Sequence, residues 1–427
     1  MKILYVSQYF PPEMGAPAAR VAELSRLWMQ AGHEVTVLTG FPNHPTGVVP
    51  VKYRRKLCRL ICREQVDGVH VVRSWLIPLP NRKAYERILN YSSFCLSAAS
   101  TGMLLSRPDV VIATSPQLLV GLAGWWLARW KRVPFILEVR DLWPESLAAV
   151  DAAKSNSLFY KILSGISGFL YRTCDHIVVV TPAFQAHLME NWKVPLEKIS
   201  VVENGVDTDF FHPHAKRAEI RRTSQAEGKF VVSYIGTMGM AHGLQTVIEA
   251  ASQLQHSMPD VLFLFVGEGA EKEKIASLAR EHGLNNVRFV AQQRRENIPA
   301  YICASDVCLV PLRKSELFST VLPSKLLEFM ACARPVILGV GGLARRIVQE
   351  ANAGIVVEPE NPTDLAQAIK QLAAQPELCA ALGCNGRHYV LQNFTRRQTA
   401  AAYLRVLEDL TERAQAYPVA ASVTGRL

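Results

Sequence analysis

The sequence predicts an α/β protein of two domains, each built on a doubly wound, largely parallel sheet. A strand, a glycine-bearing loop and a helix follow one another at the start of the chain, and the same order begins again at Phe230. A turn-rich segment, residues 203–207, lies between the two halves. With 427 residues, the chain is long enough for two domains that each have a core.

The first half begins with an apolar strand segment at residues 2–7. A loop with Pro and Gly follows at 10–17, and residues 18–30 place apolar side chains at helical spacing. Gly32 ends this helix, and residues 34–39 form the next strand. The order predicts a βαβ unit, in which ligands bind beyond the carboxyl end of the strand. Three further buried strands are expected at 110–113, 135–138 and 177–180.

The second half repeats this order with a strand at 231–235, a loop with three glycines at 236–243 and a helix at 244–254. The strand at 261–266 ends in Gly-Glu-Gly, and a helix follows at 270–281. Further strands are expected at 287–290, 307–311 and 335–338.

These patterns predict two Rossmann-like domains, 1–203 and 204–395, that face each other across a cleft. A helical pattern at 396–414 is long enough to cross back onto the first domain, so we expect 396–427 to be a crossover helix and tail.

The composition excludes several classes of protein. Hydrophobic residues make up 49% and charged residues 20%, which is typical of a globular chain and not of a disordered one. The apolar start is too short for a signal peptide, and no apolar run reaches the roughly 20 residues of a spanning helix. The nine cysteines show neither CxxC pairs nor zinc-finger spacing. We therefore expect small buried thiols in a reducing compartment and no metal site.

The net charge of +10 is concentrated in Val48–Arg87, which holds ten basic and three acidic residues. Such an excess indicates an acidic partner, although a merely solubilising basic face remains the alternative. Residues 52–63 mix cations with apolar residues at a spacing suited to an interfacial helix on an anionic membrane surface. The segment lacks a nucleic-acid-binding motif or an aromatic stacking platform, so nucleic acid is not expected as a partner. The cations proposed to contact the membrane or acceptor are Arg54, Arg55, Lys56 and Arg59.

Glycines follow the first strand of each half. Gly15 in the first half, and Gly236 and Gly239 in the second, would let backbone N–H groups approach a phosphate at a helix N-terminus. The second loop is not a P-loop, because no Gly-Lys-Ser/Thr follows it. Since loops need glycine in any case, ordinary turns remain the alternative.

The segment 315–332 is the richest in candidate residues. Pro323 and Ser324 predict a helix start with Ser324 as N-cap, and Glu328 lies one turn further on the same face. Lys325 lies in the first turn, where a cation is unfavourable for the helix dipole, so its position indicates another role such as holding a diphosphate oxygen. Glu328 has the carboxylate to accept two ribose hydroxyls. A plain capping arrangement, with Glu328 on the helix surface, is the alternative.

These motifs resemble the donor-binding region of glycosyltransferase family 4, which has the GT-B fold. The pattern is Pro-Ser-Lys-x-x-Glu-x-x-Ala at 323–331, followed by Arg-Pro-Val-Ile at 334–337 and two glycines at 341–342. Residues 8–13 and 139–145 are similar to a bacterial surface-polysaccharide branch that includes L-fucosamine transferases of O-antigen and capsule assembly. The resemblance covers nearly the whole chain.

The resemblance implies a glycosyltransferase that moves a sugar from a nucleotide diphosphate with retention of configuration, without a cofactor or an obligatory metal. UDP is the expected nucleotide, and N-acetyl-L-fucosamine is the expected sugar. The implied acceptor is a saccharide on polyprenyl diphosphate in lipopolysaccharide, capsule or exopolysaccharide synthesis. The protein would be cytoplasmic and peripherally bound to the inner membrane, with the first domain for the acceptor and the second for the donor.

Residue roles follow from the resemblance. Glu328 would bind the ribose, Lys325 the diphosphate, and Gln292 would lie near the base. Gly15 would close over the donor, while Asp141 would face the reacting sugar. The expected donor-binding residues are Gly15, Gly236, Thr237, Gly239, Gln292, Thr320, Ser324, Lys325 and Glu328, and the expected catalytic residue is Asp141.

The chain departs from the family pattern in the donor region. Relatives often have Glu-x7-Glu, but Thr320 stands eight residues before the second glutamate and Glu316 lies four residues too early. Relatives also often carry Arg and Lys in the loop where this chain has Thr237 and His242. The diphosphate is therefore expected to rely on Lys325, on backbone N–H groups or on another cation, for which Arg20 is a hypothesis.

The sequence offers no second carboxylate to pair with Asp141, so a double displacement is not expected. The departing phosphate would take the acceptor's proton, and Asp141 would position or polarise. Two other functions stay open. One is an isomerase similar to UDP-N-acetylglucosamine 2-epimerase, which would need more acid/base residues. The other is a non-catalytic nucleotide-sugar-binding protein, which the departures from the family pattern would suit.

Overall fold

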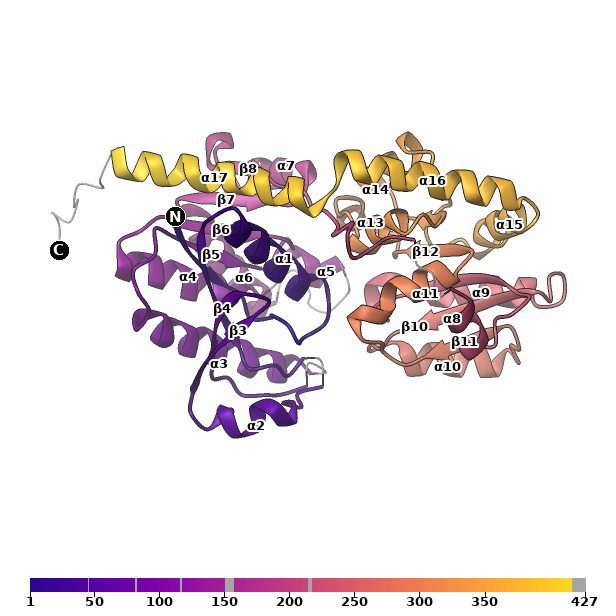
Figure 1. Cartoon of the computed structure of the whole chain (residues 1–427), viewed down its shortest axis with the longest axis horizontal. Helices are drawn as coiled ribbons and strands as arrows, with labels where there is room; N and C mark the ends of the chain where they lie inside the picture. The colour runs from indigo at the N-terminus through magenta and orange to yellow at the C-terminus, as the bar shows by residue number, and fades with distance from the viewer. Residues whose placement is uncertain (45, 81–82, 116, 150–156, 214–216, 417–427) are drawn as a thin grey trace. The chain divides into compact units, whose positions relative to one another are not determined.

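The computed structural model describes residues 1–427 except 45, 81–82, 116, 150–156, 214–216 and 417–427 (Figure 1). The described residues form two compact units. Of the described residues, unit 1 contains Met1–Ala148, 157–203 and 399–416, and unit 2 contains Ala149 and 204–398. Each unit has a sheet of its own, and none of the described helices has an apolar stretch long enough to cross a bilayer.

The sheet of unit 1 has the strand order β3-β4-β2-β1-β5-β6-β7-β8. Its neighbouring strands pair in parallel, except that the edge strand β3 runs antiparallel to β4. Several central strands are buried along their whole length, which explains their continuous apolar sequence. The strands are β1 (Lys2–Val6), β2 (Glu34–Gly40), β3 (Ile61–Val66), β4 (Val69–Ser74), β5 (Val110–Thr114), β6 (Phe135–Val139), β7 (His176–Val179) and β8 (Ile199–Val201).

Helices cover both faces of this sheet. On one face, α1 packs with α17, and the Trp28 indole donates a hydrogen bond to the Ala400 carbonyl at 3.1 Å. On the other face, Gly124 of α4 lies directly against Ala113 and Phe135, so that a Cβ there would be 2.5 Å from the Ala113 methyl. The helices are α1 (Ala16–Gln30), α2 (Val51–Leu57), α3 (Ala84–Met103), α4 (Leu118–Lys131), α5 (Glu145–Ala149), α6 (Leu158–Thr173), α7 (Pro182–Trp192) and α17 (Arg396–Ala416), and η1 (Leu196–Lys198) is a 3-10 turn.

The sheet of unit 2 is parallel throughout the described strands, in the order β11-β10-β9-β12-β13-β14. The strands are β9 (Phe230–Ile235), β10 (Val261–Val266), β11 (Val287–Val290), β12 (Val307–Pro311), β13 (Val336–Gly339) and β14 (Gly354–Val356). Alternate residues of β9 enter different cores, with Val231 in one and Val232 in the other. This alternation places helices on both faces of the sheet.

One core of unit 2 includes side chains of α9, α10 and α15, and the other includes side chains of α11, α13, α14 and α16. The helices are α8 (Arg217–Thr223), α9 (Gln245–Leu254), α10 (Lys272–Glu281), α11 (Ile298–Ala304), α12 (Glu316–Ser319), α13 (Ser324–Ala331), α14 (Gly342–Glu350), α15 (Pro362–Ala373) and α16 (Pro376–Asn393), with 3-10 turns η2 (Met240–His242) and η3 (Arg295–Asn297).

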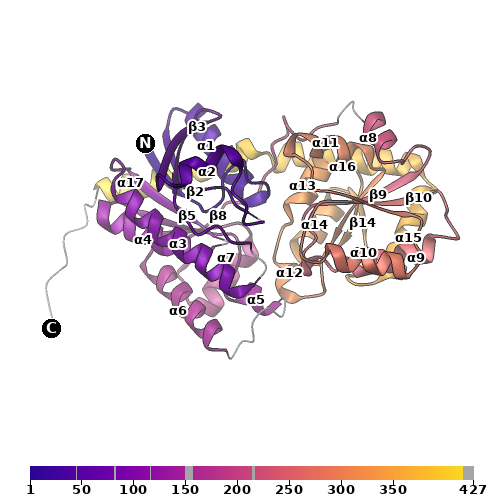
Figure 2. The ribbon, with the colours of Figure 1, turned by 90° about the horizontal axis from the view of Figure 1, so that it is seen from below.

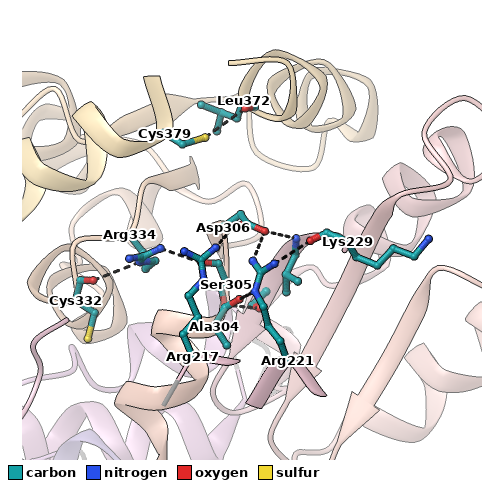
Figure 3. Close-up of polar contacts among 12 residues, drawn as sticks. Arg217, Arg221, Lys229, Ala304, Ser305, Asp306, Cys332, Arg334, Leu372 and Cys379 are labelled. Atoms are coloured by element: carbon teal, nitrogen blue, oxygen red, sulfur yellow. Dashed lines mark hydrogen bonds and ion pairs between the residues drawn. The ribbon is translucent and has the colours of Figure 1, made fainter. Parts of the chain in front are cut away.

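A carboxylate fastens α8 to the amino-terminal edge of this sheet (Figure 3). Asp306, just before β12, accepts hydrogen bonds from Arg217 at 2.7 Å, from Arg221 at 2.5 Å and from the Val231 backbone N–H at 2.8 Å. Arg334 donates to the neighbouring Ser305 carbonyl at 3.3 Å. These hydrogen bonds join α8 to the start of the sheet, at the edge opposite to the carboxyl ends of the strands, so we assign the cluster a structural role.

Candidate functional site

The carboxyl ends of the parallel strands in unit 2 bring together most of the predicted donor-binding residues. Lys325, the second residue of α13, extends toward the end of β9, where its Nζ donates a hydrogen bond to the Tyr234 hydroxyl at 3.0 Å. The same nitrogen lies 4.1 Å from the centre of the Tyr234 ring. Gly236 leaves the space for this ammonium, since a Cβ there would be 3.2 Å from Nζ.

The pKa of the Lys325 ammonium lies near neutral pH. Burial lowers the pKa of its ammonium to about 7, and the negative charge of Glu328, one helical turn away, opposes this shift. The first N–H groups of α13 and this ammonium lie at the same helix end. An anion placed there would meet the positive end of the helix and would favour the charged form of Lys325.

The loop after β9 is shaped by Tyr234 and His242. The Tyr234 hydroxyl donates to the Thr237 carbonyl at 2.5 Å, and the His242 ring meets the Tyr234 ring edge-on at 5.7 Å between centroids. The Gly239 N–H and C=O both lie within 3.3 Å of His242 Nδ1. Burial, together with the charge of Lys325, lowers the pKa of His242 to about 3. This ring is therefore neutral near pH 7 and adds no positive charge to the loop.

The loop after β10 packs directly on the loop after β9. A Cβ at Gly267 would lie 2.1 Å from the Gly236 carbonyl oxygen, and one at Gly269 would lie 2.3 Å from the Met238 carbonyl oxygen. The Met238 N–H donates to the Glu268 carbonyl at 2.9 Å. Only glycine fits at these two positions, so the Gly-Glu-Gly sequence fixes the path of the Gly236 loop.

The start of α13 differs from the prediction for Ser324. The Leu326 N–H donates to the Pro323 carbonyl at 3.0 Å, so Pro323 is the N-cap and Ser324 is the first helical residue. The Ser324 side chain makes no capping hydrogen bond. The prediction of Ser324 as cap is wrong because the extended backbone of Pro323 already turns the chain into the helix.

Thr320 ends the short helix α12. Its hydroxyl donates to the Leu317 carbonyl at 2.7 Å, and its backbone N–H donates to the same carbonyl at 3.0 Å. The start of α14 lies against this segment, since a Cβ at Gly342 would be 1.8 Å from the Ser319 carbonyl oxygen. Thr320 therefore occupies a tightly packed turn where relatives often have a glutamate.

Gln292 is exposed, two residues beyond the end of β11. The Val290 carbonyl accepts a hydrogen bond from the Gly267 N–H at 3.1 Å, which joins this segment to the loop after β10. Gln292 thus lies at the same edge of the sheet as Gly236, and β10 separates the strands that precede these two residues. Glu328 is half-buried on α13, one turn after Lys325.

Gly15 and Asp141 lie in unit 1. Gly15, with φ 123°, is the N-cap of α1, and Arg140 donates to the carbonyl of the next residue, Ala16, at 3.4 Å. Asp141 follows Arg140, and the backbone N–H groups of both residues point to the Ser115 hydroxyl at 2.8 and 3.4 Å. Burial raises the pKa of Asp141 to about 6, and the positive charge of Arg140 limits the shift.

Arg140 of unit 1 and Tyr234 of unit 2 are two candidate site residues that were not predicted from the sequence. In the described part of the chain, Arg140 Nε and Nη1 are buried without a hydrogen-bond partner. Burial lowers the pKa of this guanidinium, and the charge of Glu138 opposes the shift. Arg140 belongs to the motif at 139–145, and this motif indicated a functional segment without indicating what Arg140 does. Tyr234 was predicted only as part of a buried strand.

The structure does not support Arg20 as a diphosphate ligand. Its side chain is 1% exposed, and its Nε donates to Glu138 Oε1 at 2.9 Å. Glu138 also accepts from the Tyr5 hydroxyl at 2.7 Å. Removing Arg20 would leave the buried Glu138 carboxylate without its hydrogen-bonded ion-pair partner, so Arg20 stabilises unit 1.

The interfacial helix predicted at 52–63 is not present. Helix α2 covers only Val51–Leu57, and β3 begins at Ile61. Tyr53 and Cys62, two apolar residues of the segment, are buried with Phe41 in a small core. The prediction is wrong because the apolar positions serve this core and the edge strand. The surrounding cations Arg54, Arg55 and Arg59 are exposed, Lys56 is half-buried, and Arg54 Nε donates to the Val49 carbonyl at 3.0 Å.

Other titratable groups are spread through the structure. Five of the nine cysteines are buried, while Cys58 and Cys384 are exposed. Among the described residues, no three His, Cys, Asp or Glu side chains gather in a way that could hold a metal ion. A cavity of about 400 Å³ lies beside Lys2 and His70 of unit 1 and contains none of the predicted site residues.

Comparison with known proteins identifies both halves of the chain. Residues 15–205 match the model of the glycosyl transferase 4-like domain, and residues 216–389 match that of glycosyl transferases group 1. The putative colanic acid biosynthesis glycosyl transferase WcaI of Escherichia coli (strain K12) is 24% identical over 391 residues, which are 88% of this chain and 93% of that protein.

Solved structures share the fold along nearly the whole chain. Sucrose-phosphate synthase from Thermosynechococcus elongatus has a TM-score of 0.78 at 22% identity, covering 96% of this chain and 99% of that one. HepE from Anabaena, solved with UDP and glucose, has a TM-score of 0.72 at 17% identity, covering 96% and 100%. This chain is a glycosyltransferase of the GT-B fold, in which a glycosyl transferase 4-like domain precedes a group 1 domain.

Proposed function

We propose that this glycosyltransferase uses a UDP-sugar as donor and that unit 2 binds it at the carboxyl edge of its sheet. The arrangement of Lys325 against Tyr234 and Gly236 carries the proposal, because it places a titratable cation and a helix N-terminus together. Support for UDP comes from HepE, whose structure contains UDP and glucose.

In the proposed complex, Lys325 binds the diphosphate and Glu328 accepts the ribose hydroxyls. Gln292 is proposed to lie near the base, because its segment follows β11, which is two strands from β9 along the same sheet. The loop of Gly236, Thr237 and Gly239 is proposed to lie against the phosphates. The Thr237 N–H is the proposed donor, because the Gly236 N–H already donates to the Val266 carbonyl at 3.0 Å and the Gly239 N–H to His242 Nδ1 at 3.3 Å. The further donor contacts proposed are Gly15, Thr320 and Ser324.

The proposed reaction retains the configuration of the transferred sugar. As the sugar–phosphate bond breaks, negative charge grows on the diphosphate, and Lys325 would stabilise that charge more in the transition state than in the ground state. The departing phosphate oxygen takes the proton of the acceptor hydroxyl as that oxygen bonds to the sugar carbon. Asp141 positions or polarises the reacting groups from unit 1.

Asp141→Asn tests this role. Burial raises the pKa of the Asp141 carboxyl to about 6, so it is mostly ionised at pH 7 and protonated at pH 5. If the charged form assists the reaction, kcat/KM of the wild type falls as the pH drops below about 6. The variant should lack this acidic limb of the pH profile, and its kcat should be about 100-fold lower. A variant that keeps most of kcat/KM at pH 7 would remove Asp141 from the mechanism.

The acceptor proposed is a saccharide on polyprenyl diphosphate, in the synthesis of a lipopolysaccharide, capsule or exopolysaccharide. WcaI is named for colanic acid biosynthesis, and its match covers most of both chains. Within this class, N-acetyl-L-fucosamine is the proposed sugar, on the similarity of residues 8–13 and 139–145 to the fucosamine branch.

The proposal is tested with the purified full chain. Thermal-shift measurements against UDP-, GDP- and ADP-sugars should show stabilisation by UDP compounds, and the stabilising sugar should then be transferred to a lipid-linked acceptor. Stabilisation by a GDP- or ADP-sugar alone would contradict the UDP assignment. Formation of an epimer without acceptor would favour an isomerase, and binding without any turnover would favour a non-catalytic protein.

A further inference from the structure

Exposed apolar side chains gather on three neighbouring helices of unit 1. Half of the large hydrophobic side chains that are exposed in the described part of the chain belong to α3, α4 and α6. Examples are Leu96 at 70% exposure, Trp130 at 57% and Ile162 at 52%. Helix α4 contacts both α3 and α6, and Figure 2 shows the three helices within unit 1. We refer to their outward side as the α3–α4–α6 face.

These helices form one layer whose carboxyl-terminal ends are tied together. Lys131 at the end of α4 donates to the Met103 carbonyl at the end of α3 at 3.0 Å. Arg129 of α4 donates to the Thr173 carbonyl at the end of α6 at 3.0 Å. The rings of Trp125 and Phe169 pack edge-on between α4 and α6, with centroids 4.9 Å apart. The exposed apolar groups therefore sit on a packed layer.

The exposed groups follow helical spacing. Trp126 and Trp130 are four residues apart, so they lie on the same side of α4, where their rings stack with centroids 6.4 Å apart. On α6, Phe159 and Ile162 are three residues apart and both are exposed. Helix α4 thus has apolar residues on its outward side as well as on the side that covers the sheet. A helix that is apolar all round is normally covered on all sides, by protein or by lipid.

The charged side chains that these three helices expose have one sign. Arg129, Lys161 and Arg172 are exposed on α4 and α6, and those two helices contain no Asp or Glu. The only carboxylate within the three helices is Glu86 of α3, which is 9% exposed and accepts a hydrogen bond from the Lys83 N–H. Exposed cations with tryptophans among aliphatic residues match the boundary between the headgroups and acyl chains of an anionic bilayer.

We propose that the α3–α4–α6 face docks on a bilayer that contains anionic phospholipids, with Trp126 and Trp130 inserted at the level of the headgroups. The segment 52–63 is a weaker docking surface. Its cations remain, but Tyr53 and Cys62 are buried and cannot enter the bilayer as apolar anchors. This inference depends on the proposed function in one respect, which is that the proposed acceptor is held in a membrane. Vesicle binding needs neither donor nor acceptor, so a failure here is distinguishable from a failure of the proposed reaction.

The test is co-sedimentation of the full chain with sucrose-loaded vesicles of phosphatidylcholine containing about one-third phosphatidylglycerol. Trp126→Ser/Trp130→Ser should lower the partition coefficient at least about tenfold, because two interfacial anchors are lost. Lys161→Gln/Arg172→Gln should lower it about fivefold per charge on these vesicles and leave binding to pure phosphatidylcholine unchanged. Arg54→Ser/Arg55→Ser, on α2, tests the weaker surface and should lower the partition coefficient less than the Lys161→Gln/Arg172→Gln variant does.

Folding is checked by the melting temperature and by UDP-sugar stabilisation, both of which should be unchanged in these surface variants. The proposal is overturned if the tryptophan variant binds vesicles like the wild type, or if the α2 variant alone loses binding. It is also overturned if the wild type does not bind vesicles and forms a dimer in solution that the tryptophan variant cannot form, because the face would then bind a second copy of the chain.

Discussion

At the scale of single residues, the pKa of Lys325 should depend on whether the proposed diphosphate is bound. Burial lowers the pKa of its ammonium to about 7 from the usual value near 10.5, so the free protein loses this charge as the pH rises through 7. A bound diphosphate favours the charged form and would raise the pKa again. Binding above pH 7 must therefore take up a proton.

This linkage predicts how UDP affinity depends on pH. Above pH 7 the diphosphate itself is nearly fully ionised, and the Kd for UDP should rise by up to tenfold per pH unit. Calorimetry in buffers of different ionisation enthalpy should show proton uptake at pH 8. Lys325→Met should weaken binding and abolish both effects, whereas Lys229→Met, at the opposite edge of the sheet, should change neither. Equal proton uptake by the Lys325 variant would refute the assignment.

Glu328 allows a second prediction at this scale. If its carboxylate accepts the ribose hydroxyls, Glu328→Gln should weaken UDP binding about tenfold, because hydrogen bonds to a charged acceptor contribute roughly 1.5–3 kcal/mol. The variant should discriminate less between UDP and 2′-deoxy-UDP than the wild type does, as measured by competition. Glu249→Gln on α9 replaces a carboxylate away from the site and should leave both values unchanged. Undiminished discrimination in the Glu328 variant would place the ribose elsewhere.

At the scale of elements, the sequence predicted the strands well and the element ends less well. The strands at 261–266, 287–290 and 307–311 are confirmed at both ends. For β10 and β12 the reason is that buried parallel strands require continuous apolar sequence. The helix expected at 18–30 begins instead at Ala16, since Pro17 fits the first turn of a helix. The interfacial helix predicted at 52–63 is wrong because of tertiary packing. Tyr53 is buried in a small core with Phe41, and the local spacing of apolar residues does not reveal this core.

The candidate site shows the same division. Lys325 and the glycine loop could be located from their spacing and from the family resemblance. The contact of Lys325 with Tyr234 could not be predicted, because it joins residues 91 positions apart. The burial that lowers the pKa of Lys325 likewise depends on tertiary packing. Arg140 was hidden for a related reason, since its unsatisfied nitrogens depend on burial by neighbouring elements.

The two glycine loops of unit 2 carry a prediction at this scale. Gly267→Ala places a Cβ 2.1 Å from the Gly236 carbonyl oxygen and forces an L-residue to φ 145°, so it should destabilise unit 2 by about 3 kcal/mol and weaken UDP binding. Gly283→Ala is the matched control, because its φ is 61° with nothing within 4 Å, and it should cost about 1 kcal/mol without affecting UDP. Calorimetric unfolding and UDP titration of both variants measure the difference. Similar losses in both would mean that the contact with Gly236 is unimportant.

At the scale of the whole molecule, the described apolar cores each belong to one unit. The core around Trp28 contains Tyr5 and Tyr403 of unit 1, and the cores of unit 2 form on the two faces of its sheet. The chain enters unit 2 after Glu203 and returns to unit 1 at Thr399. Two units with separate cores are expected to respond separately to a ligand or a mutation that acts on only one of them.

Calorimetry of the full chain tests this separation together with the placement of the donor. UDP at about 100 times its Kd should stabilise unit 2 by about 2.7 kcal/mol, which corresponds to an upward shift of roughly 5–10 °C in its transition. Trp28→Ala removes a fully buried indole and should destabilise unit 1 by about 3–5 kcal/mol, lowering a different transition. In the variant, UDP should still raise the unit 2 transition. If UDP instead raised the transition that Trp28→Ala lowers, the nucleotide would bind chiefly to unit 1, and the role of Lys325 would have to be abandoned.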